Sequence, residues 1–423
     1  MLFEPMEPDL DLDLERVAGE ATEICRRLVR LNTVNPYSGD SHPGGERAGQ
    51  DYLERLWHEA GGRTERFEPP ENIYSRFGAL GPKDRSWRGR PVLTGEWLFG
   101  AGTGPRLLLF GHMDTVGTTG MTGAPFSAEL RDGKIYGRGS SDCKAGLAAG
   151  TAAVRALTRA AGAGLNGTVV LVSTVDEECD GIGAGVMALL DRGYRADVAL
   201  SLDGPGLQIT EEAGGVITAS IVLESSGGHA ASAAAGLSAL ERALKVAQAV
   251  QEFKALRREY NGCAVNLGVF QSGTHPAQVP NRALLGVNIS YTYAEALEAE
   301  KAGYGFGGGL LRPLFEEQVK KADGGAEVRW VKDGLPFRAT LDEEKVGKLM
   351  AAHAAILGRP PERSRLAGWT DACWMARAGI PTIAYGAGTP GQAHTPDEYV
   401  DIKQLNNCAK VLAVFLYNML GKV

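Results

Sequence analysis

Four short runs of apolar residues along the chain each end in polar residues that can carry chemistry. The runs are RLLLFGHMD at 106–114, TVVLVSTVDEE at 168–178, ADVALSLDG at 196–204 and IPTIAYGAG at 380–388. Within each run the apolar residues are nearly continuous, which is typical of parallel strands that are buried on both faces of a sheet. We therefore predict four buried strands, each followed by a polar turn.

Stretches with helical character lie between and after these runs. They are an Ala-rich segment at 144–161, the segment GIGAGVMALLDRG at 181–193 and the segment DEEKVGKLMAAHAAIL at 342–357. Strands that alternate with helices predict an α/β fold with a mostly parallel sheet. In such sheets ligands bind beyond the carboxyl ends of the strands, which is where the His, Asp and Glu residues of the four runs lie.

The middle of the chain has a different pattern. We predict strands at 215–225, 263–272, 283–293 and 326–332, with helices at 236–258 and 309–322. Strand–helix–strand–strand–helix–strand is the ferredoxin-like order. We therefore expect an inserted α+β domain at 214–331, serving as a lid or dimerisation domain, between two parts of a catalytic domain at 1–213 and 332–423. The connection at 294–309 has no clear assignment.

Composition narrows the class of protein. The chain has 423 residues, 44% of them hydrophobic and 22% charged, which is ordinary for a folded protein of two or three domains. The formal charge is −7 and the pI about 5.7, which argues against nucleic acid or an anionic membrane surface as the main partner.

The chain also has no sequence feature of export or membrane insertion. The N-terminus lacks a basic start and an apolar core, and no apolar run approaches the ~20 residues of a membrane span. The six cysteines are scattered, without a C-x-x-C pair, which does not indicate a disulfide framework. We expect a cytoplasmic protein.

Three polar turns along the chain hold side chains suited to metal chemistry. His112 and Asp114 are two residues apart at a strand end, so Asp114 can hold the ring of a metal-bound His112, although a buried histidine bonded to an aspartate has the same pattern. Asp142 lies in a Gly-rich turn before a helix, where aspartate is also a common N-cap. Glu177 and Glu178 follow a third acid, and adjacent carboxylates repel one another unless cations compensate.

Asp203, at the end of the third run, and His394, in the polar loop after the fourth, complete the set. Taken alone, Asp203 fits an ordinary turn aspartate and His394 fits a surface histidine. Together the five candidate ligands occur at successive strand ends of one pattern, and two imidazoles with three carboxylates suit Zn²⁺, and also Co²⁺ or Mn²⁺. A pair of ions ~3.5–4 Å apart would need a bridging carboxylate. The candidate ligands are His112, Asp142, Glu178, Asp203 and His394.

In the order GHMDTV, GRGSSDCKAG, VDEECDG, SLDG, GGHAASAAAG and AHTPDEYV, the motifs resemble those of the M20 family of metallopeptidases and deacylases. The resemblance runs from about residue 20 to the C-terminus. It implies that His112 and Asp203 hold one metal ion, that Glu178 and His394 hold the other, and that Asp142 bridges them.

The resemblance further implies that Glu177 is the general base. It also implies a homodimer in which His229 reaches the neighbouring subunit's site and helps to stabilise an oxyanion.

The chain departs from the family at positions that bind substrate carboxylates in many relatives. Ala277 and Ser290 occupy positions where those relatives have Asn and Arg, and Cys373 replaces the Arg of the desuccinylase-like members. Trp369 and Trp374 lie nearby and are equally compatible with a substrate surface or with the core. Three other arginines are candidates for binding a substrate carboxylate in place of the missing one: Arg312, Arg338 and Arg365.

We therefore expect a di-metal amidohydrolase that removes an N-acyl group from an amino-acid-like amine, with a dipeptidase or carboxypeptidase as the alternative. The missing contacts disfavour a compact N-acyl dicarboxylate as the substrate. A non-catalytic scaffold would usually lose ligands or the base, and all six residues are present. A two-metal phosphoesterase is disfavoured because no basic loop that cradles phosphate is found.

Overall fold

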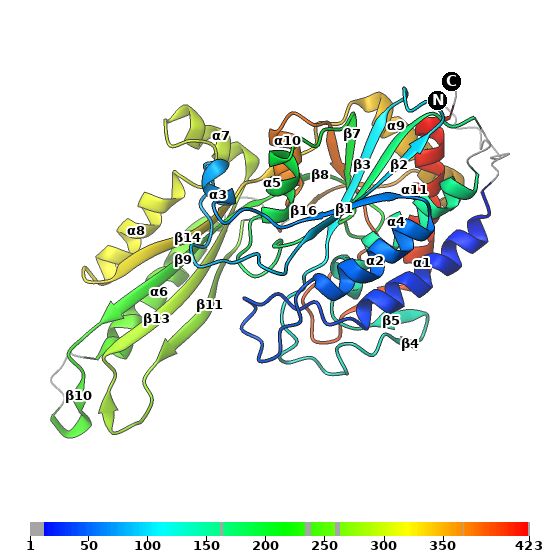
Figure 1. Cartoon of the computed structure of the whole chain (residues 1–423). Helices are drawn as coiled ribbons and strands as arrows, with labels where there is room; N and C mark the ends of the chain where they lie inside the picture. The colour runs from blue at the N-terminus through cyan, green and yellow to red at the C-terminus, as the bar shows by residue number, and fades with distance from the viewer. Residues whose placement is uncertain (1–11, 161–163, 233–237, 259–262, 367, 422–423) are drawn as a thin grey trace.

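The fold is seen in a computed structural model of the chain, which describes residues 12–160, 164–232, 238–258, 263–366 and 368–421. Two separate sheets dominate it, and Figure 1 shows the second sheet extending away from the first. No helix among the described residues has both the length and the apolar character needed to cross a membrane.

The larger sheet contains the four predicted runs as central neighbours. Its strand order is β1 (Arg63–Phe67), β2 (Val92–Phe99), β6 (Gly167–Thr174), β3 (Arg106–His112), β7 (Val198–Ser201), β17 (Thr382–Ala384), β8 (Ile209–Ala213) and β15 (Phe337–Arg338), with β16 (Arg363–Leu366) beside β8. Strands β6, β3, β7 and β17 are parallel to one another, as predicted. Antiparallel strands flank them on both sides.

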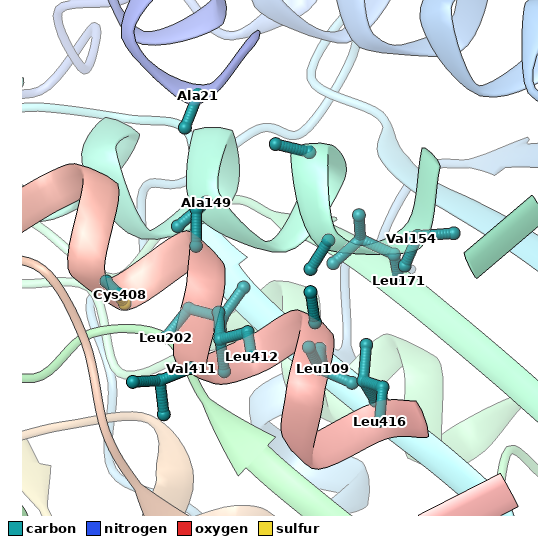
Figure 2. Packing of buried hydrophobic residues seen from close by; sticks show 14 of the residues in the cluster. Ala21, Leu109, Ala149, Val154, Leu171, Leu202, Cys408, Val411, Leu412 and Leu416 are labelled. Carbon is teal, nitrogen blue, oxygen red and sulfur yellow. The ribbon is translucent and has the colours of Figure 1, made fainter. Parts of the chain in front are cut away.

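Both faces of this sheet are covered by helices, which explains the continuous apolar runs. Leu107 and Leu109 of β3 pack into a cluster with α1 (Leu14–Val29), α2 (Arg47–Glu59), α4 (Ala145–Arg159), α9 (Glu343–Leu357) and α11 (Ile402–Leu420). The alternate residues Leu108 and Phe110 pack against α3 (Ile73–Arg76), α5 (Ala184–Asp191) and α10 (Ala372–Arg377). Figure 2 shows side chains of α4 and α11 gathered around Leu109 and Leu171.

The second sheet is antiparallel throughout. Its order is β11 (Val265–Ser272), β13 (Arg282–Tyr291), β9 (Gly215–Glu224) and β14 (Glu327–Gly334). Helices α6 (Ala239–Arg257) and α8 (Leu311–Ala322) share a buried core with one face of it. The chain order β9, α6, β11, β13, α8, β14 is the predicted ferredoxin-like one.

The connection without an assignment contains a helix, α7 (Tyr293–Lys301), which begins with a capping box between Thr292 and Glu295. Strand β14 continues to Gly334, three residues past the predicted end of the inserted domain at 331. The domain limits themselves stay a prediction.

The remaining elements are small. Strands β18 (Tyr399–Asp401), β5 (Lys134–Tyr136) and β4 (Glu129–Arg131) form a three-stranded sheet beside a single helical turn, η1 (Ser140–Lys144). Strands β10 (Gly228–His229) and β12 (Gln278–Val279) pair near a short helical turn, η2 (Ala230–Ser232). Figure 1 shows β10 at the end of the second sheet that lies far from the larger sheet.

Candidate active site

The five candidate metal ligands come together at the carboxyl ends of the parallel strands. His112 is the last residue of β3, Glu178 follows β6, Asp203 follows β7, and His394 lies in the loop after β17. Asp142 belongs to the turn η1 that precedes α4. The arrangement follows from the fold, because the ends of parallel neighbours meet at one edge of the sheet.

Asp142 lies between the two imidazoles. Its Oδ1 is 3.0 Å from His112 Nε2, and its Oδ2 is 3.3 Å from His394 Nε2. His394 Nε2 is also 3.0 Å from Glu178 Oε1. Each oxygen of Asp142 therefore faces a different histidine, which is the arrangement expected of a carboxylate shared by two ions.

Asp203 lies on the His112 side. One donor atom each of His112, Cys143 and Asp203 falls within 4.8 Å of the other two, and Asp142, Glu178 and His394 form a second such group. Burial raises the pKa of the Cys143 thiol to about 12, and the thiol is engaged with the backbone, accepting the His112 N–H at 3.2 Å and donating to the His112 carbonyl at 3.4 Å. Asp203 therefore supplies the carboxylate donor of the first of these two groups.

The electrostatics of this pocket fit a pair of cations. Burial raises the pKa of Glu177 well above its ordinary value, and the neighbouring carboxylates raise it further. The same causes raise the pKa of Asp203 to about 7. The charge of Glu178 raises the pKa of His394 to about 11. Buried carboxylates in such excess need positive charge, and imidazole and carboxylate donors suit Zn²⁺, Co²⁺ or Mn²⁺.

The turn that carries Asp142 is held by Glu398, which the sequence analysis missed. The buried Glu398 carboxylate accepts main-chain N–H bonds from Gly139 at 3.1 Å, Ser141 at 2.9 Å and Asp142 at 3.2 Å. It also pairs with the Arg138 guanidinium at 2.7 Å. Glu398 lies in the same AHTPDEYV motif as the histidine ligand, but nothing in the local pattern distinguishes it from a surface acid.

Asp114 has a different contact from the predicted one. The Nδ1 atom of His112 is 2.9 Å from the main-chain oxygen of Asp114 and 3.8 Å from its carboxylate, so the carbonyl is the hydrogen-bond partner. The carboxylate instead accepts hydrogen bonds from the Asn35 amide at 2.7 Å and from the Glu178 N–H at 3.1 Å. Asp114 thus joins the histidine strand end to the glutamate turn.

The glutamate turn is held in an unusual backbone conformation. Asp176, Cys179 and Asp180 have φ values of 68°, 56° and 64°, in the left-handed region that is uncommon for residues other than glycine. The buried Asp176 carboxylate pairs with Arg85 at 2.9 Å and accepts a hydrogen bond from the Tyr74 hydroxyl. These contacts fix the direction of the two glutamates that lie inside the turn.

His229 is not part of this cluster. It lies in β10, at the far end of the second sheet, where its Nδ1 accepts the Ala231 N–H at 3.1 Å. Ala277 lies in the same hairpin region, where its carbonyl accepts the Ala230 N–H at 3.0 Å. The side chain of His229 is exposed, so the structure of one chain separates it from the other predicted site residues.

A cavity of about 660 Å³ connects the cluster with the second sheet. Glu177, Glu178 and the other acids line one side of it. Residues of β9, β13 and β14 line the other: Val216, Asn288, Ser290 and Lys332. The side chain of Trp369 completes this second wall.

The departures from the family pattern have different locations. Ser290 lines the cavity, with its hydroxyl bonded to the Ala264 backbone, whereas Cys373 is buried in the core. Trp369 lines the cavity, but Trp374 is a core residue whose indole N–H donates to the Ile182 carbonyl at 2.6 Å.

None of the three substitute arginines lines the cavity. Arg312 pairs with Asp333, while Arg338 and Arg365 pair with Glu212 at 2.8 Å and 3.3 Å. Of the lysines and arginines that the structure describes, Lys332 is the one in the cavity wall.

Comparisons with known proteins agree with this geometry. The sequence model described as Peptidase family M20/M25/M40 matches residues 108–418. The chain is 30% identical over 349 residues, 74% of its length and 78% of the relative's, to an N-formyl-4-amino-5-aminomethyl-2-methylpyrimidine deformylase of Halalkalibacterium halodurans. It is 28% identical over 323 residues, 69% and 73% of the two lengths, to the protein of the same name from Bacillus subtilis.

Solved structures share the fold at low sequence identity. An M20 family metallo-carboxypeptidase from Sulfolobus solfataricus has a TM-score of 0.71 at 18% identity, over 95% of this chain and 99% of that one. A dipeptidase from Saccharomyces cerevisiae has a TM-score of 0.73 at 14% identity, over 96% and 98%. A dinuclear metal-binding M20 peptidase from Bacillus subtilis has a TM-score of 0.59 at 17% identity, over 96% and 99%.

Proposed function

The chain belongs to the M20 peptidase family and is a hydrolase of amide or peptide bonds, and we propose that it removes a short acyl group, such as formyl, from a planar amine that lacks a carboxylate. The observation that carries this proposal is the cavity wall opposite the acids. That wall has the indole of Trp369 and, among the described residues, no arginine. A site that binds substrate carboxylates usually supplies a bidentate arginine.

The name of the relatives supports the same substrate class. The two similar deformylases are named for a formylated aminomethylpyrimidine, which is planar and has no carboxylate. We therefore replace the amino-acid-like amine expected from the sequence with a planar, uncharged ring that carries an aminomethyl group. The reaction stays the expected one, hydrolysis of an N-acyl amide.

We propose that His112 and Asp203 hold one divalent ion, that Glu178 and His394 hold the second, and that Asp142 bridges them. The support is the placement of the two Asp142 oxygens, 3.0 Å and 3.3 Å from different imidazoles. When bound, such ions polarise an amide carbonyl and lower the pKa of a water molecule. Zn²⁺ suits the donors best, and Co²⁺ or Mn²⁺ also suit them.

Glu177 is the proton-transfer residue in this proposal. It lines the cavity next to Glu178, yet it is in neither of the two groups of clustered donors. Its carboxylate takes a proton from the attacking water as the water oxygen bonds to the acyl carbon. It then gives that proton to the amine nitrogen as the carbon–nitrogen bond breaks, which releases the free amine and the carboxylic acid. Asp114 acts as a positioning residue, because it holds the glutamate turn against the His112 strand.

We propose that His229 acts in the site of a second copy, within a homodimer formed through the second sheet. Its place at the far end of that sheet supports this role, because it lies away from the acids of its own chain. Strand β11, at the edge of the sheet, exposes Val269 and Phe270, and an exposed apolar edge is suited to burial against a partner. In the partner's site His229 would donate to the oxyanion.

A cytoplasmic location is part of the proposal. All six cysteines are free thiols, which fits a reducing compartment.

The test is a panel of amides with Zn²⁺, Co²⁺ or Mn²⁺ supplied. We expect the highest kcat/KM for N-formyl-4-amino-5-aminomethyl-2-methylpyrimidine. N-acetylornithine and succinyl-diaminopimelate should react at least about 10²-fold less well, because their carboxylates would be buried without a partner. Faster cleavage of a dipeptide than of any formyl amine would overturn the proposal and favour the peptidase alternative.

A further inference from the structure

We propose that Lys332 determines substrate specificity, by donating a hydrogen bond to an acceptor atom on the ring edge of a planar amine that lies against Trp369. This inference rests on the proposed function, because it names what that cavity recognises. Strand β14 contains an irregularity that turns the Lys332 side chain toward the cavity, whereas a regular strand would turn it toward the helices.

The irregularity is a bulge between Trp330 and Lys332. Trp330 is opposite Ala219 of β9, and Lys332 is opposite the next residue, Thr218, so one extra residue is inserted in β14. Trp330 faces the helices, where its ring packs on Phe315. In a regular strand the side chain two positions later would face the helices too. The bulge turns Lys332 to the opposite face instead.

That opposite face is the cavity wall. Thr218 of β9 is opposite both Lys332 of β14 and Asn288 of β13, so the three side chains form a row across adjacent strands. The Asn288 amide lies 3.4 Å from the Thr218 hydroxyl, and both Asn288 and Lys332 line the cavity. The bulge therefore adds a cation to a row that otherwise offers only neutral polar groups.

The protein does not use all N–H groups of the Lys332 ammonium in close hydrogen bonds. Its side chain is only 10% exposed, and its nearest recorded partners are the Gly181 carbonyl at 3.4 Å and the Asp180 carboxylate at 3.9 Å. Both contacts are long for charged hydrogen bonds, and the Asp180 side chain is itself 48% exposed. A buried ammonium with three N–H groups is costly unless they find acceptors, so a substrate acceptor in the cavity would be bound favourably.

Trp369 fixes the plane of the substrate ring. The Lys332 Nζ lies 5.9 Å from the centre of the Trp369 ring, so the two groups border the same space. A Cβ atom at Gly334 would come within 2.9 Å of the indole, so the glycine lets this ring lie directly against β14. A planar substrate stacked on the indole would present its edge to the lysine.

The acceptor that fits is uncharged. Five acidic residues line the same cavity: Asp142, Glu177, Glu178, Asp180 and Asp203. A single lysine close to Asp180 is a weak site for a carboxylate, which favours the bidentate geometry of arginine. A ring nitrogen, such as that of an aminopyrimidine, needs one N–H donor and brings no negative charge. Asn288, on the other side of Thr218 in the same row, provides an amide for a second substituent of the substrate.

The test crosses two variants with two matched substrates. The variants are Lys332→Met, which keeps the length of the aliphatic stem, and Arg329→Met, which removes an exposed charge from the same strand. The substrates are N-formyl-4-amino-5-aminomethyl-2-methylpyrimidine and N-formylbenzylamine, whose ring has no acceptor. We expect Lys332→Met to lower kcat/KM about 10–100-fold for the pyrimidine, mainly through KM, and less than about threefold for the benzylamine. Arg329→Met should leave both unchanged.

An equal loss for both substrates would overturn the inference and make Lys332 a positioning residue for the turn at Gly181. Lys332→Arg keeps a donor and should retain part of the preference for the pyrimidine, which a purely structural role does not require. Thermal unfolding of each variant shows whether the fold is intact.

Binding of the product amines separates this inference from the proposed function. We expect metal-loaded wild-type protein to bind 4-amino-5-aminomethyl-2-methylpyrimidine more tightly than benzylamine by calorimetry, and Lys332→Met to lose that preference. If no formyl amine is hydrolysed but this preference is found, the proposed function fails and the Lys332 site stands. If the formyl pyrimidine is hydrolysed and the variant keeps the preference, only the inference fails.

Discussion

The two walls of the cavity are built in different ways. The acidic wall comes from the ends of parallel strands, and buried hydrogen bonds hold its backbone, such as those that the turn at 139–142 donates to the Glu398 carboxylate. The opposite wall comes from the open face of an antiparallel sheet, where Asn288 and Lys332 have only long contacts. Chemistry needs donors fixed to within a fraction of an ångström, whereas a recognition wall can change one side chain at a time.

Because of this difference, side chains of the second wall can change without disturbing the first. Replacing a proposed ligand such as His112 breaks hydrogen bonds that join the end of β3 to the turn with Asp142. Replacing a residue in the second wall leaves the sheet intact, because the main-chain pairing of β9, β13 and β14 is unaffected. The same mechanism can therefore serve different amides.

The largest effect is expected at Asp142, at the centre of the acidic wall. Asp142→Ala should lose or misplace both metal ions and reduce turnover to background, because each carboxylate oxygen faces a different imidazole. His394→Ala, the matched variant, should mainly weaken one ion. Metal analysis after dialysis measures both, and equal losses would argue against a bridging role.

Glu177→Gln should reduce kcat by about 10²–10⁴-fold while metal content stays near wild type, because the proposed role of the residue is to move a proton and not to hold an ion. Glu178→Gln is the control on the neighbouring position and should lose metal. The measurement is turnover of the formyl pyrimidine together with elemental analysis. Metal loss from Glu177→Gln would show that the two glutamates have been assigned the wrong way round.

His229→Ala should lower kcat by about 10²–10³-fold, the usual cost of losing one oxyanion donor. Mixing this variant with Glu177→Gln should restore about one quarter of wild-type activity. Half of the dimers are then mixed, and each mixed dimer holds one complete site. If activity stays absent after subunit exchange is confirmed, His229 does not act across a dimer.

Glu398→Gln should weaken metal binding about 10–100-fold, because it loosens the turn that carries Asp142 and leaves Arg138 without its ionic partner. The exposed neighbour Asp397→Asn is the control and should change little. Competition with a chelator measures the metal affinity of both. If the two variants bind metal with equal affinity, the ion pair between Glu398 and Arg138 is not needed for metal binding.

The smallest effect concerns stability, at a buried histidine that does not line the cavity. Burial lowers the pKa of His353 to about 4, below its ordinary value of 6.5, and its ring is 2.9 Å from the Tyr385 hydroxyl. The unfolded chain therefore binds an extra proton between these values, so stability should fall as pH drops from about 6.5 to 4. His353→Gln should show a smaller drop in unfolding midpoint between pH 7 and pH 5. An unchanged drop would mean that other groups set it.

The sequence predicts the acidic wall well because two simple patterns determine it. Continuous apolar runs mark parallel strands, and polar residues directly after them must meet at one edge. The placement of His112, Glu178 and Asp203 follows from this, whereas Asp142 and His394 lie in turns that reach the same edge through packing.

The other residues of the site depend on contacts that the neighbouring sequence does not indicate. Glu398 is buried where β18 pairs with β5, beside the turn that carries Asp142. Lys332 faces the cavity only because of a bulge. The alternation of polar and apolar residues does break at Trp330 and Val331, but such a break does not by itself distinguish a bulge from the end of a strand. Whether Trp369 or Trp374 lines the cavity likewise depends on packing between the two sheets.

The central claim is that one wall of the cavity holds the metal ions and the other recognises the substrate ring. Its most direct test is a crystal structure of the protein with metal and 4-amino-5-aminomethyl-2-methylpyrimidine bound. The account predicts two ions at the acidic wall, joined by Asp142, and the ring stacked on Trp369 with a ring nitrogen near Lys332. A ring bound on the acidic side, or ions held by other residues, would contradict it.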